Sequence, residues 1–429
     1  MSLSSWAERK IGDRCIVGDG AHAKLKRHQS GVTYLSSKNL KDGRLDLLKV
    51  DYISEDDFAR LFRDNSKALT KPGKDDIIFG IIGTIGEPYL VHERDRFGLS
   101  SSVAILRPDK SIIFPKYLYY WIKGHIFQDA LYGIKGGVAQ GYVSLEMIRS
   151  LPLNYPPLPT QRKIAAILSA YDDLIENNTR RIKILEEMAS ALYREWFVNF
   201  RFPGHEKVRM EESELGPKPE GWEVYTLESV CQRITDGSHW SPKSVSNGFP
   251  MASVKDMHDW GFDITKCRQI GEEDYQKLVH NDCKPLKEDV LIAKDGSYLK
   301  HIFVVEKEID LVILSSIAIL RPNGRMLPHL LAMYLKDPSV EARMKGYVSG
   351  VAVPRIVLKD FRKFKIVIPP KNLQHNWFEL AEPMIEQCWR LISKNANLRQ
   401  TRDFLLPKLI SSEMDVSELD IKIHDGEGA

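Results

Sequence analysis

The stretch SSVAILRP at residues 101–108 returns as SSIAILRP at residues 315–322, an offset of 214 residues with seven of the eight residues identical. Other landmarks recur at nearly the same distance: Trp6 with Trp222, Cys15 with Cys231, DGAH at 19–22 with DGSH at 236–239, DII at 76–78 with DVL at 289–291, and the double prolines at 156–157 and 369–370. Chance does not keep so many landmarks in register over half a chain. The sequence therefore predicts a tandem duplication of one large unit, an arrangement that suits a two-part target.

Length and composition allow two or three domain-sized cores and exclude several classes of protein. The chain has 429 residues, 43% of them hydrophobic, and its repeat is far too long for a solenoid. A net charge of +3 neither requires nor excludes nucleic acid, because local clustering decides. We find no N-terminal signal and no apolar run long enough for a membrane helix, which predicts a cytoplasmic protein.

The five cysteines include no C-x-x-C pair, so neither a zinc site nor a disulfide framework is predicted. Cys15 and Cys231 occupy equivalent places in the repeat. We interpret them as small buried apolar residues rather than as reactive thiols.

Each copy is predicted to contain a mixed α/β globular part, although the order of strands in its sheets cannot be inferred. Short buried strands are expected at 76–79 and 289–292, and a second pair at 102–106 and 316–320, each stopped by Arg-Pro. Helices with a proline near the first turn are expected at 115–123 and 328–336.

A long helix is predicted after each double proline, because apolar residues there alternate in steps of four and three, as in a coiled-coil seam. The seam positions are Ile164, Leu168, Tyr171, Ile175, Asn178, Ile182, Leu185, Ala189 and Leu192 in the first copy, and Trp377, Ala381, Met384, Cys388, Leu391, Asn395, Leu398, Arg402 and Leu405 in the second. The polar interruptions either set the register, as polar seam residues can, or fall by chance in a solvated layer.

Two such helices in one chain favour an antiparallel pair, which would hold the globular parts at opposite ends about a pseudo-two-fold axis. The alternative is that each helix packs on its own domain. At about 40 residues, roughly 60 Å, each helix is longer than the face of most small domains. The predicted boundaries are a first globular domain at 1–156, a helical region at 157–200, a charged linker at 201–221, a second globular domain at 222–369, a second helical region at 370–412, and an acidic, disordered tail at 413–429.

Several phrases resemble the specificity subunit of type I restriction–modification enzymes, and the resemblance covers nearly the whole chain. They are QRKIAAIL at 161–168 with DD at 172–173 and IEN at 175–177, LGPKPEGW at 215–222, LLPKLISSE at 405–413, DVLIAKDGS at 289–297 and GGVAQGYVSL at 136–145. The resemblance implies an α/β (α+β) fold with two target recognition domains, each reading half of a split DNA site. They are separated by two long helices packed as an antiparallel coiled coil.

The same resemblance implies the partners and cofactors. Two methyltransferase subunits dock on the helical spacer, two motor–nuclease subunits join them on double-stranded DNA, and no membrane is involved. The specificity subunit is not itself an enzyme, so S-adenosylmethionine, ATP and Mg belong to the partners and this chain carries no cofactor.

Motifs expected of an enzyme are missing from the sequence. There is no G-x-x-x-x-G-K-[ST] phosphate loop and no N-P-P-Y methylase tetrapeptide, since NYPP at 154–157 has the wrong order. No His, Cys or Glu set has the spacing of metal ligands. Two alternatives stay open: a self-contained nuclease or methylase, and a bivalent scaffold whose two domains bind proteins.

Candidate DNA contacts are cations for phosphates and forked polar groups for base edges. The basic stretches supply Lys24, Lys26, Arg27, Lys38 and Asn39 in the first copy, and His239, Lys243 and Lys255 in the second. Glycine-containing loops supply Lys135, Gln140 and Tyr142, then Lys294, Ser297 and Lys300, and finally Arg355. The family's usual Gln falls at Gln140, whereas Val353 replaces it in the second copy. Each stretch is also compatible with a solvated loop or a tight structural turn, and GIIGTIG at 80–86 is interpreted as a turn at a DNA-facing edge.

Overall fold

The computed structural model describes residues 6–64, 68–136, 142–296, 299–349 and 355–421. The chain forms two compact units, Met1–Asn178 with Lys394–Ala429 (unit 1) and Thr179–Ser393 (unit 2). The division cuts both long helices, so each unit combines one globular repeat with a segment of each helix. In the described residues no helix is both long and apolar enough to cross a membrane.

Unit 1 is organised around a four-stranded antiparallel sheet in the order β2-β10-β7-β8. These strands are β2 (Cys15–Asp19), β7 (Ile77–Gly80), β8 (Pro88–Leu90) and β10 (Val103–Pro108). A three-stranded sheet β6-β3-β9 contains β3 (Val32–Leu35), β6 (Asp51–Ile53) and β9 (Phe97–Leu99), with β3 parallel to β9. The remaining pairs are β1 (Ala7–Lys10) with β11 (Pro152–Tyr155), and β4 (Leu40–Lys41) with β5 (Arg44–Leu45).

The helices of this globular part are short. They are α1 (Ile11–Arg14), the 3₁₀ turn η1 (Ser37–Asn39), α2 (Glu55–Leu61), α3 (Pro115–Lys123), α4 (His125–Gly136) and α5 (Leu145–Ser150). The helix expected at 115–123 is confirmed, with Pro115 at the first helical position, where its missing N–H costs nothing.

Unit 2 repeats this arrangement. Its four-stranded sheet β15-β23-β20-β21 contains β15 (Cys231–Asp236), β20 (Val290–Ala293), β21 (Ile302–Val304) and β23 (Ile317–Pro322). Its three-stranded sheet β19-β16-β22 contains β16 (Ser244–Ala252), β19 (Arg268–Ile270) and β22 (Val312–Ile313), with β16 parallel to β22. The pair β14 (Glu223–Thr226) with β26 (Lys365–Ile368) and the hairpin β17 (Met257–His258) with β18 (Gly261–Phe262) match those of unit 1, which confirms the duplication.

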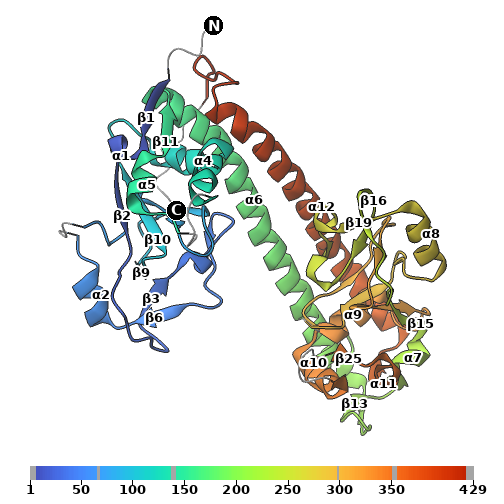
Figure 1. Cartoon of the computed structure of the whole chain (residues 1–429). Coiled ribbons are helices and arrows are strands. Elements are labelled where there is room, and N and C mark those ends of the chain that lie inside the picture. The colour runs from blue at the N-terminus through green and yellow to red at the C-terminus, as the bar shows by residue number, and fades with distance from the viewer. Residues whose placement is uncertain (1–5, 65–67, 137–141, 297–298, 350–354, 422–429) are drawn as a thin grey trace. The chain divides into compact units, whose positions relative to one another are not determined.

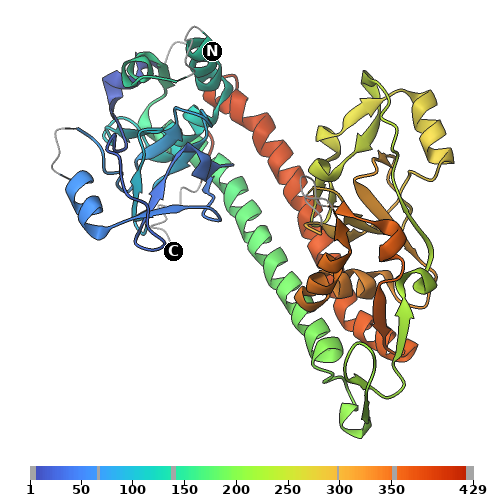
Figure 2. The same cartoon turned by 60° about the horizontal axis from the view of Figure 1, so that its bottom comes forward.

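The remaining elements of unit 2 are two short strand pairs, five short helices and several single turns, many of which have counterparts in unit 1. The two-stranded pairs β12 (Met210–Glu211) with β13 (Lys218–Pro219) and β24 (Val348–Ser349) with β25 (Arg355–Ile356) are accompanied by α7 (Leu227–Val230), α8 (Glu272–His280), α9 (Pro328–Lys336), α10 (Pro338–Met344), α11 (Leu358–Phe361), the π-helical turn η2 (Arg194–Val198) and the 3₁₀ turns η3 (His205–Lys207), η4 (Val254–Asp256), η5 (Ile264–Lys266) and η6 (Lys345–Tyr347). Helix α8, yellow in Figure 2, lies beside the three-stranded sheet. The helix expected at 328–336 is α9.

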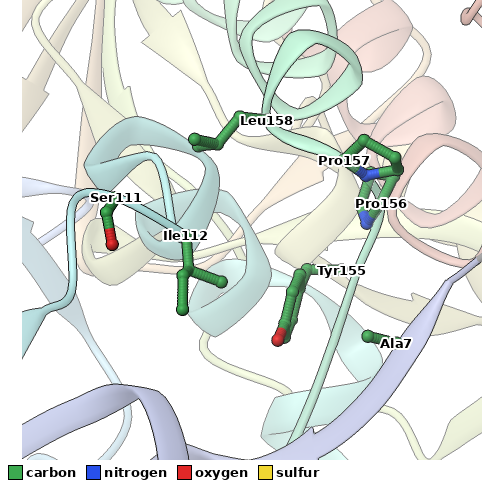
Figure 3. Close-up of a pocket in the computed structure, with 7 residues that line it drawn as sticks. All are labelled: Ala7, Ser111, Ile112, Tyr155, Pro156, Pro157 and Leu158. Carbon is green, nitrogen blue, oxygen red and sulfur yellow. The ribbon is translucent and has the colours of Figure 1, made fainter.

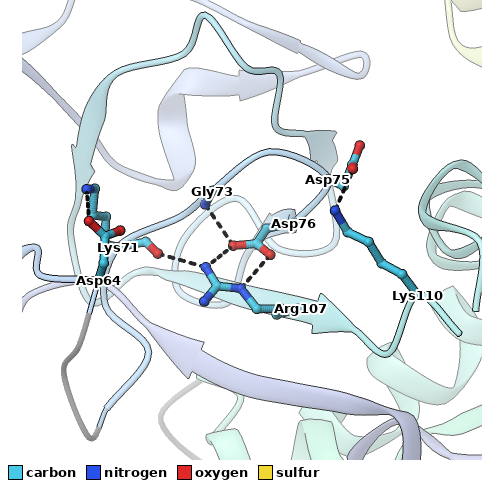
Figure 4. A network of polar contacts seen from close by, with 7 residues as sticks. All are labelled: Asp64, Lys71, Gly73, Asp75, Asp76, Arg107 and Lys110. Carbon is cyan, nitrogen blue, oxygen red and sulfur yellow. Dashed lines mark hydrogen bonds and ion pairs between the residues drawn. The ribbon is translucent and has the colours of Figure 1, made fainter. Parts of the chain in front are cut away.

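The arginine of the repeated phrase pairs with a buried aspartate in each unit. The Arg107 guanidinium donates to both oxygens of Asp76 at 2.9 and 2.7 Å, and Asp76 also accepts from the Gly73 N–H at 2.8 Å (Figure 4). Arg321 forms the same bidentate pair with Asp289 at 2.8 and 2.8 Å. A buried carboxylate needs a partner of this kind, because an unpaired one would be costly to desolvate.

The strands expected at 76–79, 289–292, 102–106 and 316–320 are confirmed. The second pair of strands includes the Arg-Pro dipeptide and ends with it, because β10 and β23 end at Pro108 and Pro322. A proline is tolerated at the last position of a strand, where the missing N–H interrupts no ladder beyond it.

The two long helices are α6 (Leu158–Tyr193) and α12 (Lys371–Ile410). Each has a buried glutamine near its start. The Gln161 side chain accepts from the Phe114 N–H and donates to the carbonyls of Ile112 and Pro156, each at 2.8 Å. Gln374 makes the equivalent three bonds to Leu327, Arg325 and Pro369. The glutamine of the QRKIAAIL phrase therefore ties the helix start to the globular part.

The helices pair within each unit, and the partners run in opposite directions. In unit 1, Asn178 donates to the Asn395 side-chain oxygen at 2.9 Å, and Asp172 forms an ion pair with Arg402. In unit 2, the thiol of Cys388 contacts the Ile182 carbonyl at 3.8 Å. The antiparallel coiled coil is thus confirmed, and its polar interruptions face one another: Asn178 and Asn395 are 4% and 3% exposed. Of the two interpretations left open, this favours a role in register over chance placement.

We expect the asparagine pair to cost stability when only one member is replaced. Asn178→Leu removes the donor to a buried amide, so the free energy of unfolding of unit 1 should fall by about 1–3 kcal/mol. The double variant Asn178→Leu/Asn395→Leu should recover most of the loss, because two leucines suit the seam. Urea unfolding in a double-mutant cycle measures the coupling, with the exposed Asn177→Leu as control. Additive losses would show that the pair does not act as a unit.

The end of the chain completes the core of unit 1. Leu406, Leu409 and Ile410 of α12 are buried, and Val416 beyond the helix is 1% exposed in the same hydrophobic cluster. Lys163 donates to the Ser417 carbonyl at 2.5 Å. The expectation that the acidic tail is disordered from residue 413 was therefore wrong for its first part, since an apolar side chain among the charges finds a place in the core. Residues 422–429 lie outside the described residues.

The predicted linker at 201–221 is also packed. Phe202 lies in the core of unit 2 with its ring 5.7 Å from that of Trp222, and β12 pairs with β13 in the same stretch.

Burial raises the pKa of the Cys15 and Cys231 thiols to about 12, which agrees with small buried residues rather than reactive ones.

Candidate nucleic-acid interface

The open hollow at the start of α6 is not suited to chemistry. It is lined by Ala7, Ser111, Ile112, Tyr155, Pro156, Pro157 and Leu158, as Figure 3 shows. The Tyr155 hydroxyl accepts from Arg14 at 2.7 Å, and the rest of the lining is apolar or a single serine. No pair of acid and base groups meets there, so the exposed loops of each unit are the stronger candidates for a site.

The loops of unit 1 meet at one end of its four-stranded sheet. The DGAH loop follows β2, and η1 is held by Ser37, whose N–H donates to the Ser102 hydroxyl at 3.1 Å and whose hydroxyl donates to the Ile82 carbonyl at 2.5 Å. Ile82 forms an antiparallel bridge with Tyr142. The serine of the repeated phrase thus joins η1 to this end of the sheet.

Unit 2 builds the same framework. The Val254 N–H of η4 donates to the Ser316 hydroxyl at 3.3 Å, as Ser37 does to Ser102. The glycines of the two DG-x-H loops are required by close approach, because a Cβ on Gly20 or Gly237 would lie 2.2 or 2.1 Å from a backbone carbonyl. In both loops the histidine contacts the aspartate three residues earlier, with 2.7 Å from His22 to Asp19 and 3.3 Å from His239 to Asp236.

The structure argues against Asn39 as a DNA contact. Asn39 is 6% exposed; its side-chain oxygen accepts from the Ser36 N–H at 2.9 Å, and its amide donates to the carbonyls of Asp46 and Lys49. Asp256 holds η4 in the same way, accepting from the Ser253 N–H at 2.8 Å. The matched S-x-x-[ND] capping pattern in the two copies was the signal that sequence reasoning missed. The adjacent Lys38 and Lys255 are exposed.

Lys294 is also occupied by the fold. It is 7% exposed, and its ammonium pairs with Asp236 at 2.9 Å and lies 3.6 Å from Asp295. A DNA contact would require this buried pair to open, at a large desolvation cost. The pair instead fastens the DGSH loop to the loop after β20.

The basic stretch of unit 1 lies on the exposed surface beside the three-stranded sheet. Lys24 and Lys26 are exposed, and Arg27 donates to Asp51 at 2.9 Å while its guanidinium lies 4.2 Å from the centre of the Tyr34 ring. In unit 2, His239, Lys243 and Lys300 are exposed as well. These cations are accessible to phosphates without any rearrangement of the core.

The candidates in the glycine-containing loops fall into two groups. Gln140, Ser297 and Val353 lie outside the described residues, whereas Lys135 belongs to the last turn of α4. Tyr142 and Arg355, which flank two of these stretches, are described and exposed.

The hairpins next to η1 and η4 are anchored differently. In unit 2, Trp260 of the β17–β18 turn packs edge-on against Trp389 of α12 at 5.5 Å, and its indole N–H donates to Glu186 of α6. In unit 1, Gly43 of the β4–β5 turn sits so close to Tyr119 that a Cβ would lie 2.3 Å from its hydroxyl. Both hairpins are therefore fixed by large aromatic side chains, which positions the neighbouring turns.

Comparisons with known proteins agree with this architecture. The family model described as the type I restriction modification DNA specificity domain matches residues 4–187 and 219–398. The MjaIX specificity subunit of Methanocaldococcus jannaschii is 27% identical over 322 residues, 72% of this chain and 71% of the relative. The HindI specificity subunit of Haemophilus influenzae is 22% identical over 408 residues, 80% of this chain and 87% of the relative.

A solved structure shows the same fold. The crystal structure of a type I restriction–modification S subunit from M. genitalium matches with a TM-score of 0.55 at 16% identity, covering 95% of this chain and 97% of that chain. The resemblance found in the sequence is confirmed by the match of the family model to both repeats. The chain belongs to the type I restriction–modification DNA specificity family.

Proposed function

We propose that this chain is the non-catalytic DNA-recognition subunit of a type I restriction–modification complex. Each globular repeat reads one half of a bipartite, asymmetric DNA sequence. Two methyltransferase subunits dock on the helices, two motor–nuclease subunits join them, and the cofactors S-adenosylmethionine, ATP and Mg serve those partners. We expect the complex to act in the cytoplasm.

One observation carries the proposal. The two units share sheets, capping turns and buried ion pairs, yet present different side chains on the loops at the same end of the four-stranded sheet. A scaffold that holds two different loop sets in the same way suits a reader of two different half-sites. The exposed lysines Lys24, Lys26 and Lys38, which follow one another closely in the sequence, suit phosphate contacts and favour DNA over a protein partner.

The test is a titration of duplex DNA carrying the motif that is methylated in cells. Because the chain has a net charge of only +3, we expect the partner subunits to supply much of the positive charge that binds the phosphates. We expect weak binding by the chain alone and at least roughly ten-fold tighter, sequence-specific binding with the methyltransferase, at one fixed salt concentration. Equal affinity with and without the methyltransferase would contradict the proposal.

A matched pair of variants sharpens this titration. Lys24→Ala/Lys26→Ala should weaken binding on all sequences and reduce the salt slope by about 0.9 for each phosphate that is no longer neutralised. Lys207→Ala, at an exposed lysine of η3, is the control and should leave both unchanged. If the control lowers affinity as much, general charge rather than the loop attracts DNA.

A further inference from the structure

The two units carry different residues at one matched pair of loop positions. Ile82 forms an antiparallel bridge with Tyr142 in unit 1, and Asp295 forms the same bridge with Arg355 in unit 2. Both partners are offset by 213 residues, from 82 to 295 and from 142 to 355. The backbone bonds beside the bridges also match, with the Val143 N–H donating to the Ile81 carbonyl at 3.1 Å and the Ile356 N–H to the Lys294 carbonyl at 3.0 Å. The two units therefore have the same backbone bridge, with apolar and aromatic side chains in unit 1 and charged side chains in unit 2.

In unit 1 the bridge carries an apolar and an aromatic side chain, and both are partly exposed. Ile82 and Tyr142 are each 43% exposed, and Tyr132, which is 50% exposed, donates to the Ile85 carbonyl of the same loop at 3.4 Å. Ile82 also accepts a hydrogen bond at its carbonyl from the hydroxyl of Ser37, so the same loop is bonded to η1. Ile82 and Tyr142 offer an apolar contact on a loop that Ser37 bonds directly, and the next residue, Lys38, is an exposed cation.

In unit 2 the same bridge carries an acid and a guanidinium. Arg355 is exposed, whereas Asp295 is 27% exposed at its side chain and lies 3.6 Å from the Lys294 ammonium. The ion pair of Lys294 with Asp236 fastens the loop after β20, which contains Asp295, to the DGSH loop. The bridge therefore ties the backbone of Arg355 to the loop that Lys294 fastens, and the exposed guanidinium has the planar, forked donors that guanine recognition requires.

We propose that this matched bridge determines part of the sequence specificity of each unit. In unit 1, Ile82 and Tyr142 contact the 5-methyl group of a thymine. In unit 2, Arg355 donates to O6 and N7 of a guanine, and Asp295 helps to orient that loop. The inference rests on the proposed function, because it assigns base contacts to a surface that is taken to face DNA.

The experiment uses the full chain assembled with its methyltransferase and duplexes carrying the motif methylated in cells. Each thymine is replaced in turn by deoxyuridine, which lacks the 5-methyl group, and each guanine by 7-deazaguanine, which lacks N7. For the wild type, one deoxyuridine position should weaken binding by about 4-fold, the value expected for one buried methyl group. One deazaguanine position in the other half-site should weaken it by roughly ten-fold.

Variants connect these positions to the two bridges. Ile82→Ala/Tyr142→Ala should abolish the sensitivity to deoxyuridine and leave the deazaguanine effect intact. Arg355→Lys keeps the positive charge but loses the fork, so it should abolish the deazaguanine effect while general DNA affinity changes little. Ile16→Ala, at an isoleucine that is 63% exposed on β2, is the matched control and should change neither.

The failure of this inference differs from the failure of the proposed function. A complex that shows no preference for the methylated motif would overturn the proposed function. Specific binding in which neither base analogue responds to the variants, or in which both sensitive positions lie in one half-site, would overturn the bridge as a determinant of specificity.

Discussion

A chain that ends at Phe404 is expected to lose the fold of unit 1 while unit 2 stays folded. The truncation removes Leu406, Leu409, Ile410 and Val416, all buried in the core of unit 1. Deleting one buried leucine or isoleucine side chain costs about 2–5 kcal/mol, so losing several exceeds the roughly 5–15 kcal/mol that stabilises a typical domain. Hydrogen exchange should show β10 unprotected and β23 protected.

Two control variants separate this effect from simple shortening. A chain that ends at Ile421 keeps all the buried residues of the tail that the structure describes, and we expect it to unfold like the full-length protein. Leu409→Ala should destabilise unit 1 by about 2–5 kcal/mol, whereas Phe404→Ala, at a side chain that is 61% exposed, should be within about 0.5 kcal/mol of the parent. Protection of β10 in the chain that ends at Phe404 would show that the tail is dispensable.

Inserting one heptad into α6 alone, between Asn178 and Ile182, is expected to abolish assembly with the methyltransferase. The insertion separates the Asn178–Asn395 contact from the Ile182–Cys388 contact by seven residues on one helix only. The two sets of contacts can then no longer form together, because the second helix keeps its original spacing. Co-purification of the complex measures the loss.

Inserting a heptad into both helices, with the second between Cys388 and Asn395, should restore the seam. It adds about 10.5 Å to each helix, because seven residues rise by 1.5 Å each. If the helices set the distance between the two readers, this length corresponds to about three extra base pairs at roughly 34 Å per 10 base pairs. Activity should fall because DNA twist also rotates one half-site. An active double-insertion variant that methylates a motif with an unchanged gap would show that the helices do not set the distance.

The repeats explain why much of the fold could be predicted from the sequence. Pro115 and Pro328 mark helix starts by their own geometry, and the seam residues follow the helical period, so α3, α9, α6 and α12 are local features. Sheet order was not predictable. In unit 1, β2 pairs with β10, far along the chain, and the described strands of that unit have only two to six residues, which carry little pairing information. The match between Asn178 and Asn395 also depends on a register that only the folded helices reveal.

The candidate site was predicted less well, because exposure and partners are properties of the folded chain. Asn39 and Lys294 have the right chemistry for DNA, yet one caps a turn and the other is buried against Asp236. Tyr142 and Arg355 were identified as candidates, but their backbone pairing with Ile82 and Asp295 became visible only in the folded chain. The sequence indicated only that the two loops correspond, because residues 82 and 142 lie 213 residues before residues 295 and 355.

A map of methylated bases in cells that carry this chain and its methyltransferase tests the central proposal most directly. Two repeats that each read half of the target predict one asymmetric motif with two specified parts and an unspecified gap between them. When residues 1–156 are exchanged for those of a relative, only one part of the motif should change, since unit 1 and unit 2 have separate cores. A single uninterrupted motif, or a change in both parts with the protein still folded, would contradict the account.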